Sequence, residues 1–301
     1  MSRTMSVTSS LHQPESIWDI GAMLGEGALW DAPSRSGYFV DIKGRRVHRC
    51  AVDGSERRSW EAPGPVGFAL PIEGGGLVCG VQGGLYRLEE ASGVFSRLLP
   101  VEADRPGNRL NDGYVDAAGA LWFGSMDDGE SAHSGALYRL DARGLARMDE
   151  GYIITNGPAA SPDGTVLYHT DTLGRRTWAF DLAADGSLSG KRLFAQFPGH
   201  GHPDGMAVDS EGQVWIALFG GGRIERYAPD GRLTASVAFP CSNITKLAFG
   251  GDDMRTAYVT TARKGLSPAQ LADQPLAGNL FAFRVAAPGL PQPAVSKEVF
   301  A

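Results

Sequence analysis

The 301 residues carry a formal net charge of −6 at pH 7, with 43% hydrophobic and 21% charged residues. Such a chain suits two ordinary domains or one large all-β domain, with ample apolar material for a core. The acidic balance and the lack of a Lys/Arg block argue against nucleic acid as a partner. No run approaches the roughly 18 apolar residues of a membrane span, so we expect no membrane contact.

The polar N-terminal segment 1–14 is expected to be disordered, and it lacks the apolar stretch of a signal peptide. Three widely spaced cysteines, Cys50, Cys79 and Cys241, form neither a disulfide framework nor a zinc site by their spacing. We therefore expect buried thiols in a reducing compartment, which makes the cytoplasm the expected location.

A repeat dominates the chain from about Glu15 onward. Short strands alternate with turns rich in Gly, Asp and Pro, and only residues 267–274 suggest a helical turn. A turn that matches the pattern Asp-x-x-Gly closely or loosely precedes an apolar strand in six places. These strands begin at Tyr38, Leu77, Leu121, Val166, Val214 and Ala257. A period of roughly 40 to 50 residues with several strands per unit is typical of a propeller blade.

We therefore predict an all-β fold, a six-bladed β-propeller that forms a single domain over residues 15–301. The ring needs closing, and a strand near 16–20 is expected to complete the blade that holds the strand around 279–285. A β-sandwich is the structural alternative, but six repeats in register argue against it.

Four segments, 24–27, 108–113, 154–157 and 199–209, share one layout, in which a polar residue precedes Gly or Asp and then a strand. In a propeller the innermost strands line a central channel. Asn111 follows Glu26 by 85 residues, about two blade lengths. Asn156 follows Asn111 by 45 residues and Asp204 follows Asn156 by 48, about one blade length each. Glu26, Asn156 and Asp204 are therefore expected to meet at one level of that channel. Two carboxylates and an amide oxygen suit a divalent cation, which predicts a metal site there.

Other interpretations of these residues remain open. Asn, Asp and Glu beside Gly are common in turns, so each predicted ligand also fits a purely structural role. His200 and His202 could bind a metal as His-x-His or lie on a solvated loop, and His202 is retained as a possible pocket residue. No Gly-x-Ser-x-Gly motif is present, so covalent nucleophilic catalysis is not supported.

Seven short motifs in order carry a family resemblance. They are LGEG (24–27), FVDI (39–42), NRLNDG (108–113), ITNG (154–157), PDG (203–205), FGG (249–251) and TAR (261–263). On these motifs the chain after about Trp18 resembles the gluconolactonase/regucalcin-like (senescence marker protein) family. The similarity is greatest to bacterial sugar lactonases that act on xylono-, arabinono- or gluconolactone.

The resemblance implies roles for five residues. Glu26, Asn156 and Asp204 are expected to bind one divalent metal ion (calcium, zinc, manganese, magnesium or iron), and Asp204 is also the expected general base. Arg109 and Asn111 are the expected substrate-binding residues.

The chain departs from the family at one position. Animal regucalcins have a substrate-binding Glu where this chain has Gly129, although Asp127, Asp128 and Glu130 flank it. The roles of these three carboxylates, and the choice of lactone, are left open.

The expected function is metal-dependent hydrolysis of a pentono- or hexonolactone to its aldonic acid by a lactone hydrolase. The expected partner is a small sugar lactone, and the protein is expected to be a monomer or a weak homo-oligomer. Propellers share metal pockets across substrates, so two alternatives stay open. One is a hydrolase of phosphotriesters or non-sugar lactones, which an apolar pocket rim would favour. The other is a non-catalytic propeller that binds calcium or a protein partner.

Overall fold

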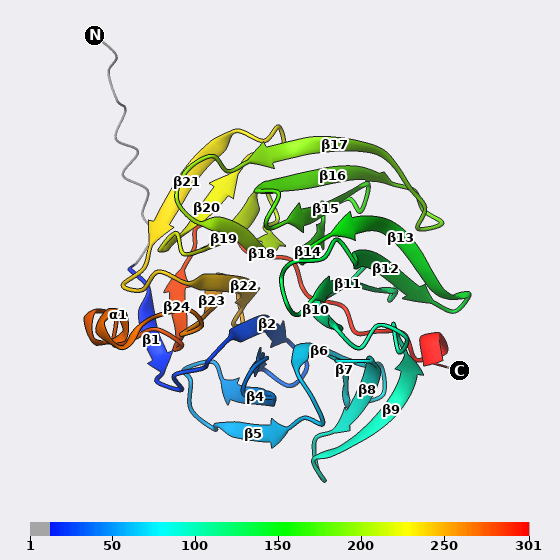
Figure 1. Cartoon of the computed structure of the whole chain (residues 1–301), viewed down its shortest axis with the longest axis horizontal. Coiled ribbons are helices and arrows are strands. Elements are labelled where there is room, and N and C mark those ends of the chain that lie inside the picture. The colour runs from blue at the N-terminus through cyan, green and yellow to red at the C-terminus, as the bar shows by residue number, and fades with distance from the viewer. Residues whose placement is uncertain (1–12, 301) are drawn as a thin grey trace.

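The computed structural model describes residues 13–300, and these form six four-stranded antiparallel sheets around a central axis (Figure 1). Five sheets each use four consecutive strands, and the sixth combines both ends of the described chain. We number these sheets as blades 1 to 6 in chain order. The predicted six-bladed β-propeller is therefore confirmed. The predicted disorder of segment 1–14 concerns residues of which 1–12 lie outside the described part.

In every blade the strand named first lies nearest the axis and the strand named last lies outermost (Figure 1). Blade 1 holds β2 (Gly25–Asp31), β3 (Ser36–Asp41), β4 (Arg46–Ala51) and β5 (Arg58–Glu61). Blade 2 holds β6 (Val66–Pro71), β7 (Leu77–Val81), β8 (Gly84–Glu89) and β9 (Val94–Pro100). Blade 3 holds β10 (Asn108–Val115), β11 (Leu121–Asp127), β12 (Gly135–Asp141) and β13 (Gly144–Tyr152). Blade 4 holds β14 (Thr155–Ala160), β15 (Val166–Asp171), β16 (Arg176–Leu182) and β17 (Leu188–Gln196). Blade 5 holds β18 (His202–Val208), β19 (Val214–Phe219), β20 (Arg223–Tyr227) and β21 (Leu233–Ala238). Blade 6 holds β22 (Ile244–Gly250), β23 (Thr256–Thr261), β24 (Leu280–Arg284) and β1 (Glu15–Trp18).

Pairing of β1 with β24 closes the ring. Glu15 lies opposite Ala282 and Ser16 opposite Phe281 in an antiparallel register. The side chain of Asn279 adds a hydrogen bond, because its Nδ2 donates to Ser16 Oγ at 3.1 Å. The predicted closure by the strand near residue 16 is confirmed.

Helical structure in residues 13–300 is confined to two short elements. Helix α1 (Pro268–Asp273) begins after Ser267, whose side chain accepts a hydrogen bond from the backbone of Gln270 in a capping box. This agrees with the predicted helical turn. The 3₁₀ helix η1 (Lys297–Phe300) ends the described chain. Neither helix in residues 13–300 has the length and apolar character needed to cross a membrane.

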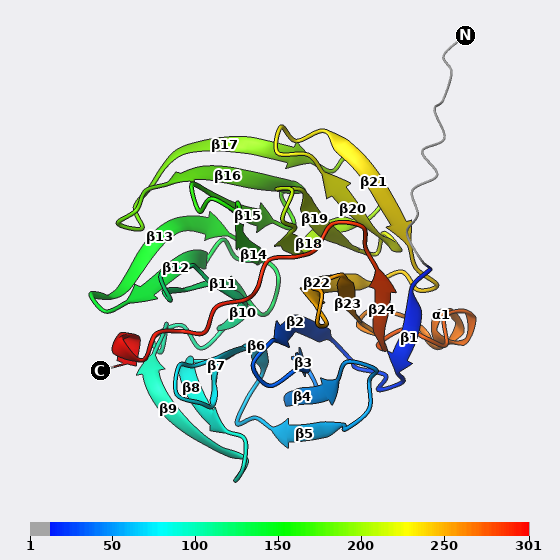
Figure 2. The same ribbon diagram turned by 180° about the vertical axis from the view of Figure 1, so that it is seen from behind.

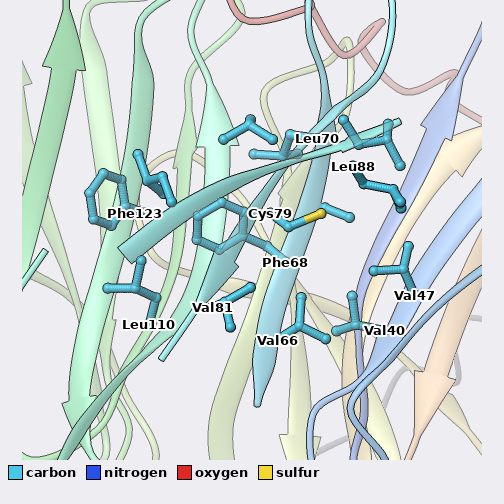
Figure 3. Packing of buried hydrophobic residues seen from close by; sticks show 14 of the residues in the cluster. Val40, Val47, Val66, Phe68, Leu70, Cys79, Val81, Leu88, Leu110 and Phe123 are labelled. Atoms are coloured by element: carbon cyan, nitrogen blue, oxygen red, sulfur yellow. The ribbon is translucent and has the colours of Figure 1, made fainter. Parts of the chain in front are cut away.

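The core lies between neighbouring sheets, where apolar side chains of adjacent blades interdigitate (Figure 3). Val40 of blade 1, Phe68 of blade 2 and Leu110 of blade 3 belong to one continuous cluster and are at most 1% exposed. β-branched and aromatic residues favour strands because they fit this pleated, buried surface. The three cysteines are free and buried, as predicted. Contact between sheets therefore fixes the blades relative to one another.

The Asp-x-x-Gly turns have a structural role. In blade 3, Asp116 accepts hydrogen bonds from two backbone amides of its own turn and from Trp122 Nε1 at 2.8 Å. In blade 5, Asp209 repeats this pattern with Trp215 Nε1 at 2.8 Å. Each carboxylate thus joins a turn to the large buried side chain of the next strand, which explains why this pattern recurs along the sequence.

Segment 286–300 runs across one face of the ring, from blade 6 toward blades 2 and 3 (Figure 2). The backbone amide of Ser210 donates to Pro288 O at 2.9 Å, that of Val295 to Pro71 O at 2.8 Å, and that of Ser296 to Gly119 O at 3.0 Å. Val295 is fully buried in the blade 1–3 cluster. This segment covers one end of the channel, a feature that the repeat pattern did not predict.

The burial of Val295 predicts a large cost for a charge at this position. Val295→Asp should lower the free energy of unfolding by about 3 kcal/mol, because an unpaired carboxylate would enter the apolar cluster. Chemical denaturation measures this change. Lys297→Asp, which puts the same group on an exposed position two residues away, is the control. Equal loss in both variants would show that the segment does not pack as described.

Buried His169 predicts sensitivity of the fold to acid. Its ring lies edge-on to Tyr152, and neither ring nitrogen has a hydrogen-bond partner among the described residues. Burial lowers the pKa of His169 to about 3 from an ordinary value of 6.5. Between these values the unfolded chain binds a proton that the folded chain does not, so stability falls as pH drops below about 6.5.

The variant His169→Phe should therefore lose less stability between pH 7 and pH 5 than the wild type, by about 2 kcal/mol. The measurement is the free energy of unfolding at both pH values. Leu193→Phe, which places the same ring on an exposed position and changes no titratable group, is expected to keep the wild-type pH dependence. If the free energy of unfolding of His169→Phe depended on pH as the wild type's does, the proposed role of His169 in acid sensitivity would be wrong.

Candidate functional site

The innermost strands of all six blades share an irregularity in their pairing with the second strand. The register with the second strand shifts between Glu26 and Leu29, Val66 and Phe68, Leu110 and Gly113, Asn156 and Ala159, Pro203 and Met206, and Ile244 and Lys246. A bulge of this kind bends the strand and re-aims the side chains around it. The predicted ligands lie at these shifts, and this is why the repeat brings them to one level.

A cavity of about 230 Å³ opens at the end of the channel where the innermost strands begin. Its polar wall includes every residue predicted for the site, namely Glu26, Arg109, Asn111, Asn156 and Asp204, together with His202. His200 is exposed on the preceding loop and does not line the cavity. The structure therefore brings the five predicted residues together and separates the two histidines.

The two carboxyl groups of the site are buried side by side. Glu26 and Asp204 are each 5% exposed. Glu26 Oε2 accepts one hydrogen bond, from its neighbour's backbone amide at 3.2 Å, whereas Asp204 Oδ1 has no partner in residues 13–300. Burial, reinforced by the charges of Glu26 and Asp112, raises the pKa of Asp204 well above its ordinary value, and burial likewise raises that of Glu26. A bound cation would relieve this repulsion and satisfy the unpartnered oxygen.

Asn156 supplies the third oxygen of the predicted set. Its Nδ2 donates to Thr172 Oγ1 at 2.9 Å, and its Oδ1 accepts from Asn111 Nδ2 at 3.0 Å. These bonds fix the orientation of the amide and leave Oδ1 a second lone pair. Acidic, histidine and cysteine side chains in the described chain form no group of three that could hold a metal. A cation here would therefore depend on the amide of Asn156 as well as on Glu26 and Asp204, and this all-oxygen set fits a hard divalent ion.

Arg109 is held by a chain of charged hydrogen bonds that reaches the rim. Its Nε donates to Asp128 Oδ1 at 2.7 Å, and its Nη1 donates to Asn111 Oδ1 at 2.5 Å. Lys43 of blade 1 donates to the same Asp128 at 2.7 Å. Asp128, whose role the sequence left open, thus orients Arg109 toward the cavity.

The other two acidic residues of this loop have different positions. Asp127 accepts hydrogen bonds from the backbone amides of Ser131 and Ala132, both at 2.9 Å, and so shapes the loop itself. Glu130 lines the cavity and pairs with Lys264 of blade 6. Sequence reasoning missed Lys264, although it directly follows the TAR motif at 261–263.

Part of the cavity wall is apolar, which the sequence motifs did not predict. The side chains concerned are those of Leu24, Met126, Ile154, Leu173 and Phe219. They come from loops and strand ends in four different blades, so no single stretch of sequence contains them all.

Another ion pair lies within the channel, next to the carboxyl groups of Glu26 and Asp204. Lys246 Nζ of blade 6 contacts Asp112 Oδ1 of blade 3, and their side chains are 9% and 2% exposed. Asp112 Oδ2 also accepts from the backbone amide of Gly157 at 3.1 Å. Burial raises the pKa of Asp112, and the charge of Lys246 opposes this rise. Lys246 therefore pairs with one of the three acidic side chains gathered at the axis.

This burial predicts that the pair matters for stability. Lys246→Met should lower the free energy of unfolding by about 3–5 kcal/mol, because it leaves the Asp112 carboxylate buried without a partner. Arg35→Met is the control, since it breaks a pair whose side chains are 68% and 70% exposed, and it should change stability little. Denaturant titration of both variants makes the comparison, and similar effects would contradict the prediction.

A family model and two known proteins match most of the chain. Residues 24–263 match the family described as SMP-30/Gluconolactonase/LRE-like region. The chain is 34% identical to 6-deoxy-6-sulfogluconolactonase of Pseudomonas putida, covering 90% of this chain and 94% of that protein. It is 39% identical to L-arabinolactonase of Azospirillum brasilense, covering 86% and 87%.

The fold has a similarly close counterpart among solved structures. The crystal structure of a calcium-binding protein, regucalcin, from Agrobacterium tumefaciens superposes with a TM-score of 0.90 at 28% identity, covering 95% of this chain and 97% of that one. The family match spans most of the chain and includes all five predicted site residues. The chain belongs to the SMP-30/gluconolactonase/LRE-like family.

Proposed function

We propose that this protein hydrolyses a sugar aldonolactone to the corresponding aldonic acid with the help of one divalent metal ion. The observation that carries the proposal is the pair of buried carboxyl groups, Glu26 and Asp204, beside the oriented amide of Asn156 in one cavity. Two sugar lactonases among the relatives support the reaction class. Calcium, zinc, manganese, magnesium and iron remain candidates, because oxygen ligands accept all of them.

A lactone is a cyclic ester, and its hydrolysis passes through a tetrahedral oxyanion. A divalent cation held by Glu26, Asn156 and Asp204 would supply positive charge to stabilise that oxyanion. Asp204 takes a proton from the water that attacks the carbonyl carbon. The ring C–O bond then breaks, and the ring oxygen takes up the proton that Asp204 had accepted and becomes a hydroxyl group of the open acid.

Arg109 and Asn111 orient the sugar. The Arg109 guanidinium is fixed by Asp128 and by Asn111, so it can donate hydrogen bonds to hydroxyl oxygens without losing side-chain entropy on binding. Asn111 links Arg109 to Asn156, because its Nδ2 donates to Asn156 Oδ1. Substrate binding and the proposed cation site are thus connected by a single hydrogen-bonded chain.

One observation favours a second candidate. The apolar side of the cavity, which includes Met126 and Phe219, suits a lactone or phosphotriester with an apolar substituent. The charged side, which includes Arg109, Glu130 and Lys264, suits a polyol better, and we therefore place sugar lactones first.

Asp204→Asn should reduce kcat about 100-fold or more on the preferred lactone, because it removes the proposed base. Acid release from xylono-, arabinono-, glucono- and galactonolactone measures the rate. A chelator should abolish turnover, and single divalent metals should restore it. Asp273→Asn, on the exposed surface of α1, is the matched control and should retain wild-type rates.

Two results would contradict this proposal. Full activity of Asp204→Asn would rule out Asp204 as the base. Absence of turnover above the spontaneous rate with any metal would reject sugar-lactone hydrolysis, and phosphotriesters and apolar lactones would be assayed next.

A further inference from the structure

One ion pair in the cavity wall joins opposite sides of the ring. Glu130 lies in the loop between β11 and β12 of blade 3, and Lys264 follows β23 of blade 6. Lys264 Nζ contacts Glu130 Oε1, and both side chains line the cavity. The side chain of Lys264 is 32% exposed and that of Glu130 is 34% exposed, whereas Glu26 and Asp204 are each 5% exposed. The pair therefore lies at the outer end of the cavity, away from the buried carboxyl groups.

The backbone of Lys264 is fixed before any substrate binds. Its amide donates to Met23 O at 2.8 Å, and its carbonyl accepts from Asn243 Nδ2 at 2.9 Å. These contacts tie the residue to blade 1 and to the loop before β22. The backbone of Lys264 is thus held at the rim, where its side chain reaches Glu130.

The loop that carries Glu130 is equally constrained. Glu130 has φ of 56°, a left-handed conformation that few residues other than glycine adopt. Its amide donates to Asp127 O at 3.0 Å, while the Asp127 carboxylate accepts from backbone amides further along the loop. The backbone therefore directs the Glu130 side chain toward the cavity.

The charges around the cavity are matched in pairs. Lys264 is offset by Glu130, and Arg109 by Asp128. Among the described residues that line the cavity, neither of these cations is left without a carboxylate partner. An anionic substituent beside Lys264 would meet the negative charge of Glu130. A hydroxyl group, which both donates and accepts, can bond to the carboxylate and the ammonium together.

We propose that Glu130 and Lys264 form a specificity-determining subsite that binds hydroxyl groups at the end of the lactone remote from its carbonyl. This subsite selects neutral polyhydroxy lactones and disfavours lactones with a negatively charged substituent at that end. The inference rests on the proposed lactonase function, because it places the reacting carbonyl near Asp204 and the remote end near the rim.

The experiment compares two substrates that differ only at carbon 6, glucono-1,5-lactone and its 6-deoxy-6-sulfo counterpart. For the wild type, kcat/KM should be at least about tenfold higher for the neutral lactone, which corresponds to about 1.4 kcal/mol. Glu130→Gln leaves the charge of Lys264 without a partner. It should shift the ratio of the two kcat/KM values at least about tenfold toward the sulfonated lactone. Lys264→Met should raise KM for the neutral lactone without creating activity on the sulfonated one.

Arg284→Met serves as the control, because it breaks a solvent-exposed ion pair with Asp253 outside the cavity. Its substrate ratio should equal that of the wild type. A wild type that prefers the sulfonated lactone, or a Glu130→Gln variant with an unchanged ratio, would overturn the proposal.

Failure of the lactonase function itself gives a different result, namely no turnover of either lactone by the wild type with any divalent metal. Calorimetric titration with glucitol and glucitol 6-phosphate then tests the subsite without catalysis. Tighter binding of glucitol by the wild type, and a shift toward the phosphate in Glu130→Gln, would support the charge selection. Preference of the wild type for the phosphate would overturn it.

Discussion

Closure of the ring by β1 and β24 is the constraint on which the other features depend. Blade 6 needs a fourth strand, and the chain supplies it from the opposite end, with Ser16 opposite Phe281. Once closed, the ring fixes the innermost strand of each blade at the axis. Polar residues that are far apart in the sequence, such as Glu26 and Asp204, then share one cavity.

Bringing those residues together places acidic groups close to one another, and an ion pair in the channel offsets part of their repulsion. Asp112, Glu26 and Asp204 are all buried at the axis, and Lys246 neutralises only the first of them directly. The remaining two carboxyl groups, one with an unpartnered oxygen, leave a concentration of negative potential that suits a divalent cation. The burial of these carboxyl groups together is unfavourable for folding, and it also prepares the channel to bind a cation.

The two ends of the channel differ in construction. Segment 286–300 covers one end with backbone hydrogen bonds and the buried side chain of Val295. The other end is bordered by charged side chains, including Arg109 and the Glu130–Lys264 pair. Access to the site is consequently expected from one face only, where the composition of the rim decides which substrates enter.

The sequence by itself determined the number of blades, the closing strand and the five predicted site residues. Turns such as that of Asp116 repeat because each blade needs the same hydrogen bonds, and repeated local needs leave a repeated pattern. The outermost strands left a weaker signal because their residues are mostly exposed, as in β13.

Only the tertiary structure decided which charges meet. The pairs Asp112–Lys246 and Glu130–Lys264 each join residues 134 positions apart, on opposite blades. Their contacts depend on the closed ring and on the conformation of individual loops, as at Glu130, and neither leaves a periodic trace in the sequence. The motifs therefore indicated the five predicted site residues, whereas the rest of the cavity wall was identified only from the fold.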